Sequence, residues 1–135
     1  MMFNFSQKSL KQLATLDIRL QDILNDAINY IDFSILESHR DQLRQNNLYN
    51  HGFSKLRWPN GKHNKWPSLA VDISPYPQDW SDDKKAWGRF YLLAGHIIYA
   101  AHRQGIKIRW GGDWDGDGDL KDQSFDDLGH FEIGE

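Results

Sequence analysis

The feature that most constrains this chain is a short apolar run that contains a carboxylate. Residues 69–73 read Leu-Ala-Val-Asp-Ile, which is the pattern of a buried strand. Burying the ionised side chain of Asp72 costs free energy unless it is paired with another group or ligates a metal. The fold must therefore bring a partner for Asp72 from elsewhere in the chain.

The periodicity of apolar residues predicts an α+β fold. Three- and four-residue spacing predicts a helix over about 6–30 and a stronger one over about 81–104. A polar helix is expected to about residue 50, followed by a long irregular loop over 53–67. Short strands are expected at 33–37, 69–73, 106–110 and 130–133. This order favours one compact domain over 1–135, with helices packed on a small, mostly antiparallel sheet.

Composition excludes several classes of site. The 135 residues contain no cysteine, so disulfides, thiolate zinc sites and thiol nucleophiles are excluded. A net charge of −3 is unlike that of a nucleic-acid-binding polycation, and no apolar run is long enough to span a bilayer. The N-terminus lacks the pattern of a secretory signal. We therefore expect a cytoplasmic monomer whose partners include neither nucleic acid nor membrane.

Two of the six histidines stand out by position. His63 and His130 each lie near an acidic residue and at a junction between a loop and a strand, where scaffolds often present functional groups. Three other histidines fall in or beside helical patterns, and we expect no chemistry from them: His51, His96 and His102. His39, at a strand end, is left undecided.

The sequence predicts that His63, Asp72 and His130 surround one metal ion. Without cysteine, two imidazoles and a carboxylate suit a catalytic zinc, with a fourth position left for water. A carboxylate over such a site can act as a base, and Asp127, three residues before His130, is the candidate. The alternative is that His63 and Asp72 only pair with each other in a loop.

Four pieces of the chain form a recognisable set: Glu37-Ser-His-Arg40, Lys62-His63 with Ala70-Val-Asp72, Trp110-Gly-Gly-Asp-Trp114 and Asp127-Leu-Gly-His130-Phe-Glu. Together they resemble the VanY-type zinc peptidases of peptidoglycan, the D-Ala-D-Ala carboxypeptidases and L-alanyl-D-glutamate endopeptidases. The resemblance spans roughly residues 33–133 and is closest to single-domain phage endolysins.

The resemblance implies a role for each residue. It places Zn²⁺ on His63, Asp72 and His130, makes Asp127 the catalytic base, and gives Arg40 the task of holding the substrate and polarising its carbonyl. The implied activity is hydrolysis of the L-Ala-D-Glu bond of the peptidoglycan stem peptide, by an endolysin kept in the cytoplasm until lysis. A D,D-carboxypeptidase and a non-catalytic zinc-containing binding module are the alternatives.

The chain departs from the family pattern in its first motif. The usual Ser-x-His-x-x-Gly-x-Ala-x-Asp here has Gly61 in place of the Ser and Ser68 in place of the Gly. Two extra residues carry Asp72 to nine positions after His63. The expected effect is on the shape of the loop rather than on the ligands. Asp126, beside Asp127, is the competing candidate for the base.

An acidic, glycine-punctuated loop follows the third predicted strand. Its alternation resembles the first half of a calcium-binding loop, although Ser124 occupies the position where an EF-hand needs Glu. The expectations here are a loose Ca²⁺ site, or a solvated turn with loop hydrogen bonds from Asp113. The candidate calcium ligands are Asp113, Asp115, Asp117 and Asp119. Four tryptophans could line a substrate groove or pack beneath loops: Trp58, Trp66, Trp110 and Trp114.

Overall fold

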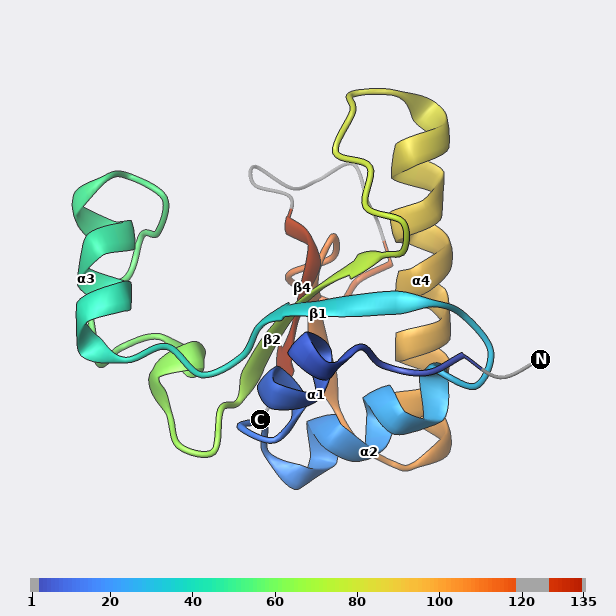
Figure 1. Cartoon of the computed structure of the whole chain (residues 1–135), viewed down its shortest axis with the longest axis horizontal. Coiled ribbons are helices and arrows are strands. Elements are labelled where there is room, and N and C mark those ends of the chain that lie inside the picture. The colour runs from blue at the N-terminus through green and yellow to red at the C-terminus, as the bar shows by residue number, and fades with distance from the viewer. Residues whose placement is uncertain (1–2, 119–126, 135) are drawn as a thin grey trace.

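A four-stranded antiparallel sheet forms the centre of the molecule (Figure 1). The computed structural model describes residues 3–118 and 127–134. The strands lie in the order β1-β2-β4-β3, and each neighbouring pair is antiparallel. Their bounds are β1 Phe33–Glu37, β2 Ala70–Pro75, β3 Ile108–Gly111 and β4 Asp127–Ile133. The predicted α+β class with a small antiparallel sheet is confirmed.

Three helices cover the sheet and enclose the core. The 20-residue α4 (Lys84–Arg103) contacts β2, β3 and β4, and α2 (Ile18–Ala27) packs against α4. The shorter α1 (Gln7–Leu13) contacts β1. These contacts bury a continuous set of aliphatic and aromatic side chains, and burial of this kind is the main force that stabilises a domain. Core residues with at most 1% exposure include Leu16, Leu20, Ile23, Leu24, Val71, Ile73, Leu93, Ile97, Phe131 and Ile133.

The single N-terminal helix predicted over 6–30 is wrong, because the chain forms two helices there. Between them the backbone leaves the helix to pair with the segment before β2: Ser68 N donates to Thr15 O, and Asp17 N donates to Ser68 O. Asp17 then caps α2 by accepting a hydrogen bond from the backbone N–H of Arg19. The apolar spacing continues across this break, so periodicity alone does not reveal it.

The helix α3 (Gln42–Asn50) projects away from the sheet, at the left of Figure 1. It begins where Asp41 accepts a hydrogen bond from the backbone of Arg44, and Gly52 follows its end with a φ of +78°. The irregular loop after it confirms the expectation for 53–67, apart from a 3₁₀ turn, η1 (Lys62–Asn64). The last helix, α4, matches its prediction closely.

The strand β4 begins three residues earlier than predicted, so that Asp127 lies in the sheet. Gly111 of β3 is paired with Asp127, and a Cβ at Gly111 would overlap the backbone carbonyl of Asp127. A glycine is therefore required for the two strands to approach there. The Gly-Gly pair after Trp110 thus helps to position the candidate base.

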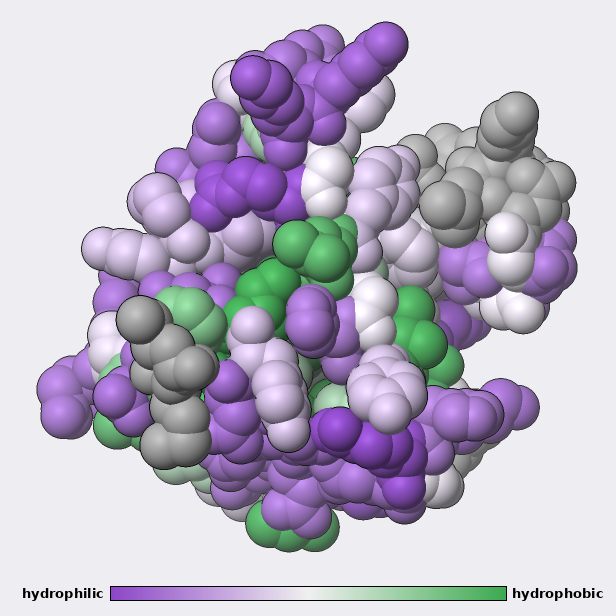
Figure 2. Space-filling view, turned by 90° about the vertical axis from the view of Figure 1, so that its right-hand side faces the viewer, coloured by the Kyte–Doolittle hydropathy of each residue, from purple (hydrophilic) through white to green (hydrophobic). Residues whose placement is uncertain are grey.

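The face on which α4 lies is largely polar, with apolar side chains gathered at its centre (Figure 2). Exposed apolar residues of α4 include Leu92, Ile98 and Tyr99. In the described part of the chain, no helix combines the length and the apolar character needed to cross a membrane.

Candidate metal centre

Three separate parts of the chain bring His63, Asp72 and His130 together. Asp72 and His130 are directly opposite each other on β2 and β4, and His63 comes from the η1 turn. One candidate ligand atom from each residue lies within 4.8 Å of the others. Both histidines are buried and the carboxylate is half-buried. The predicted grouping is confirmed as one that could hold a metal ion.

His63 has one ring nitrogen fixed and the other left for a ligand. Its Nδ1 lies 2.7 Å from the carbonyl oxygen of Ser38, so Nδ1–H donates and Nε2 keeps its lone pair. That Nε2 is buried without a hydrogen-bond partner, 3.4 Å from Oδ2 of Asp72. A buried polar atom without a partner is costly in a folded protein, and a metal ion at this position would satisfy it. The donor set therefore fits a metal.

His130 is oriented by Glu132, a residue that the sequence prediction missed. The Nε2 of His130 lies 2.8 Å from Oε1 of Glu132, and its Nδ1 lies 3.0 Å from Oδ1 of Asp72. A carboxylate on the outer nitrogen of a metal-binding histidine fixes the ring and raises its basicity. Because alternate residues of a strand share a face, the His130-Phe-Glu132 spacing could have indicated this pairing.

Arg40 lies beside the centre and is held by three acceptors. Its guanidinium donates to Glu37, to Oε1 of Gln45 at 3.2 Å and to Oδ2 of Asp72 at 3.2 Å. Burial opposes ionisation of Asp72, but the hydrogen bond with His130 holds the pKa of Asp72 well below its usual range. Asp72 is therefore ionised at neutral pH, as a metal ligand must be.

Asp127 lies close to the three candidate ligands. Burial raises the pKa of Asp127, the charge of Asp72 raises it further, and the positive charges of His130 and Arg40 only partly offset this rise. A carboxyl group whose pKa is shifted towards neutrality is better suited to proton transfer than an ordinary surface aspartate. Asp126, the competing base, lies outside the described residues.

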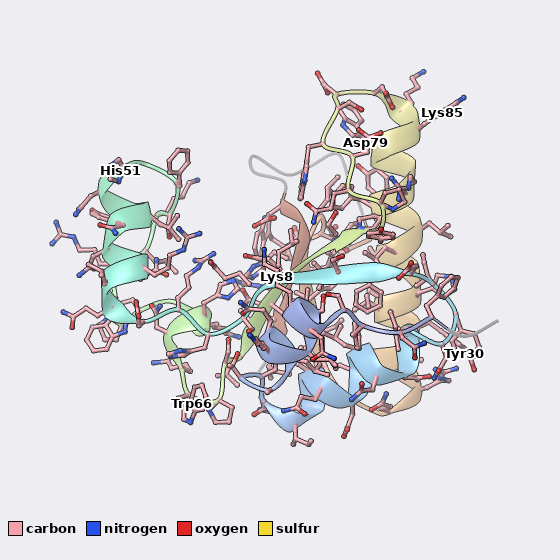
Figure 3. All side chains as sticks on the ribbon, viewed as in Figure 1. Lys8, Tyr30, His51, Trp66, Asp79 and Lys85 are labelled. Carbon is pink, nitrogen blue, oxygen red and sulfur yellow. The ribbon has the colours of Figure 1, made fainter. Side chains whose placement is uncertain are left out.

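Two cavities meet at this centre, and Arg40 and Asp127 line both. The first, of about 490 Å³, lies between α3 and the start of α4. The second, of about 380 Å³, lies over the loop after α3 and also reaches His63 and His130. In Figure 3, Asp79, which lines the first cavity, lies on the segment that leads into α4. The centre is therefore open on two sides.

The protonation of His130 gives a prediction for protein prepared with a chelator. Burial alone would lower the pKa of His130, but hydrogen bonds to Asp72 and Glu132 raise it to about 9. The folded-state pKa thus lies above the unfolded value near 6.5, so this stabilisation is full below pH 6.5 and is lost as pH rises through 9. We expect the chelated protein to lose up to about 3 kcal/mol of unfolding free energy over this window.

Urea unfolding of chelated protein at pH 6.5 and pH 9 measures this loss. The loss should vanish in His130→Gln and persist in His51→Gln, since His51 is exposed and its Nδ1 lies against the backbone carbonyl of Asn47, one helical turn earlier. A wild-type unfolding free energy that stays constant or rises over this window would contradict the prediction.

The acidic loop brings three of its four predicted calcium ligands together. Carboxylate oxygens of Asp113, Asp115 and Asp117 lie within 4.8 Å of one another, and Asp119 lies outside the described residues. The expected loop hydrogen bond is present, since Gly118 N donates to Oδ2 of Asp113 at 2.9 Å. Calcium binding here stays a prediction.

If the loop binds Ca²⁺, millimolar CaCl₂ should raise the melting temperature of the wild type and not that of Asp115→Asn. The physical reason is that a bound cation offsets the mutual repulsion of the clustered carboxylates. Desolvation raises the pKa of Asp115, and the charge of Asp117 raises it further. MgCl₂ at the same concentration controls for ionic strength. An unchanged melting temperature would exclude the site.

His51, His39 and the four tryptophans named above lie in different parts of the molecule. His51 lies near the end of α3 far from the sheet, and Trp66 lies at the outer bend before β2, in edge-to-face contact with His39 (Figure 3). Trp110 packs in the core against Phe131, as the packing alternative expected. Trp114 lies against His130 and lines the second cavity. Trp58 and Trp66 do not line the cavities that meet at the metal centre, as far as the described residues show.

Comparison with known proteins gives a consistent result. The family model described as "Phage L-alanyl-D-glutamate peptidase" matches residues 1–133. The L-alanyl-D-glutamate peptidase of Escherichia phage T5 is 31% identical over 141 residues, covering 98% of this chain and 99% of that protein. The crystal structure of the L-Ala D-Glu endopeptidase ChiX of Serratia marcescens matches with a TM-score of 0.76 at 23% identity. That match covers 97% of this chain and 90% of ChiX, and it shows a shared fold. The chain therefore belongs to the phage L-alanyl-D-glutamate peptidase family.

Proposed function

We propose that this protein is a zinc-dependent endopeptidase that hydrolyses the L-alanyl-D-glutamate bond of the peptidoglycan stem peptide. The main support is the buried group of His63, Asp72 and His130, which could hold a metal ion. The Nε2 of His63 faces the Asp72 carboxylate without a hydrogen-bond partner, and Asp127 lies beside the group. Membership of the phage L-alanyl-D-glutamate peptidase family and the similarity to the L-alanyl-D-glutamate peptidase of phage T5 support the choice of bond.

Zinc is the metal that best suits this donor set. Two imidazole nitrogens and one carboxylate leave one open position, which is the arrangement of catalytic rather than structural zinc sites. When bound, zinc supplies Lewis acidity, which makes water a better nucleophile and a carbonyl a better electrophile. The protein contributes the fixed orientation of the two rings through Ser38 and Glu132.

Asp127 and Arg40 carry the other two roles. The Asp127 carboxylate accepts a proton from the attacking water and then delivers it to the nitrogen of the departing D-glutamyl amine. Arg40 uses three of its five N–H groups on acceptors among the described residues, so the other two can donate to the substrate carbonyl as its oxygen gains negative charge. Its contacts with Glu37 and Gln45 hold the guanidinium in position for this task.

Digestion of purified peptidoglycan tests the function directly. Wild-type protein is incubated with and without a chelator, then with zinc restored, and the products are analysed by mass spectrometry. Chelator-sensitive release of peptides with a free D-glutamyl amine supports the proposal. Loss of only terminal D-Ala would indicate a D,D-carboxypeptidase, and bound zinc without any product would indicate a non-catalytic binding module.

The proposed setting is lysis of a bacterial host by a phage. We infer that the protein works as a monomer, is stored in the cytoplasm of the producing cell and acts on the wall once the membrane is breached. The similarity to the L-alanyl-D-glutamate peptidase of phage T5 supports this setting.

A further inference from the structure

The two cavities that meet at the metal centre have opposite charge. The smaller one is lined by four cationic and two acidic side chains, whereas the larger one is lined by two cationic and four acidic ones. Arg40 and Asp127 line both cavities, so their charges cancel in the comparison. Apart from the proposed ligand Asp72, the contrast comes from Lys55, Lys62, Arg109 and Glu132 in the smaller cavity and from Arg44, Glu37 and Asp79 in the larger one. The larger cavity also has an aromatic wall, which includes Trp80 and Trp87. A bound chain that crosses the centre would therefore meet two different environments.

The substrate of the proposed function is asymmetric in a matching way, and the inference rests on that function. A glutamyl residue has two carboxyl groups, and chain extension uses one of them, so the glutamyl side of the scissile bond keeps a free carboxylate. The alanyl side carries no charge and leads to the muramyl sugar of the glycan. The anionic glutamyl side would bind best to cationic side chains. The uncharged alanyl side, with its sugar, would bind best to an aromatic surface.

Arg109 of β3 is the cation best placed to bind the glutamyl carboxylate. Its guanidinium lies over the ring of Trp114 at 5.2 Å, and its Nη2 lies 3.2 Å from Oε2 of Glu132, the carboxylate that orients His130. Packing of this kind restrains the planar group, and a guanidinium has donors for more than one partner. The side chain is 50% exposed, so these further donors can reach the cavity.

At the other cavity, two tryptophans offer exposed faces. Trp80 is 63% exposed and is supported from behind by Phe90, with ring centroids 5.1 Å apart. Trp87, in the first turn of α4, is 46% exposed. Large apolar side chains that are exposed together beside a cavity are typical of a binding surface. Flat rings of this type suit the apolar face of a sugar.

We propose that the substrate crosses the metal centre in one direction. The glutamyl side, held through its free carboxylate by Arg109, occupies the smaller cavity, whose charged side chains are mostly cationic. The alanyl side and its muramyl sugar occupy the larger cavity and lie against Trp80 and Trp87.

The test uses four synthetic substrates and measures kcat/KM for each. The peptide L-Ala-D-Glu-L-Lys is made with the free glutamyl carboxylate or with its amide, and each form is made with an N-acetylmuramyl group or with an N-acetyl group. Variants Arg109→Gln and Trp80→Ala are compared with the wild type. Arg103→Gln is the matched control, because Arg103 pairs with Asp26 and does not line either cavity.

The wild type should prefer the acid over the amide by about 10- to 100-fold, the usual strength of a charged hydrogen bond. Arg109→Gln should abolish this preference and keep the preference for the sugar, whereas Trp80→Ala should do the reverse. Zinc content and melting temperature, measured in parallel, show that each variant is folded and loaded. A purely structural role for Arg109 would lower all four rates equally.

An acid preference that survives in Arg109→Gln would overturn the assignment. Loss of the sugar preference in Arg109→Gln, with loss of the acid preference in Trp80→Ala, would reverse the direction. A wild-type protein that cleaves none of the four substrates while loaded with zinc would overturn the proposed function, and the assignment with it.

Discussion

Replacing Asp127 with asparagine is expected to lower kcat for peptidoglycan hydrolysis by roughly 100- to 10,000-fold, the range that a positioned base contributes. Asparagine keeps the size of the side chain but cannot take the proton from water. Because Asp127 is not one of the three proposed ligands, zinc content should stay at the wild-type level. Turnover assays and metal analysis of the same preparation measure both quantities.

The matched control for this substitution is Asp126→Asn. The two acids are adjacent in sequence, and both were candidates for the base. If Asp127 is the base, Asp126→Asn should retain most of the activity. Undiminished lysis by Asp127→Asn would refute the mechanism, and a large loss confined to Asp126→Asn would transfer the role to the neighbouring residue.

Replacing His63 with alanine is expected to remove bound zinc and to abolish hydrolysis. Its Nε2 is the buried, unpartnered nitrogen that faces Asp72, so no other described atom at this position can replace it as a ligand. With only Asp72 and His130 left, the site holds two protein ligands, fewer than the three that catalytic zinc requires. Metal analysis after dialysis against trace zinc should give less than a tenth of the wild-type content.

The control for His63 is His51→Ala, which removes an exposed imidazole from the end of α3. That variant should bind zinc and turn over like the wild type. Thermal unfolding of chelated His63→Ala and chelated wild type separates loss of metal from loss of fold. Full zinc content in a folded, active His63→Ala protein would exclude the proposed ligand set.

Much of the fold follows from local sequence patterns. The strand at 33–37, the helix ending before Gly105 and the buried strand that carries Asp72 are set by side-chain periodicity and by capping residues, which act within a few positions. The break between α1 and α2 is different, because it depends on backbone hydrogen bonds to Ser68, some fifty residues away. No local pattern records such a contact.

The candidate site, like the fold, has some features that local sequence indicates and others that depend on contacts between distant segments. A buried strand with a carboxylate, two histidines at loop–strand junctions and an acid three residues before the second histidine could be recognised from residue type and spacing. The contact of Arg40 with Asp72 and the approach of Gly111 to Asp127 could not. Residue types limit which groups can bind a metal or move a proton, so the available chemistry follows from the amino-acid sequence. The free nitrogen of each histidine and the cavities that open on the centre follow from the three-dimensional arrangement, because both depend on strand register and on packing between distant segments.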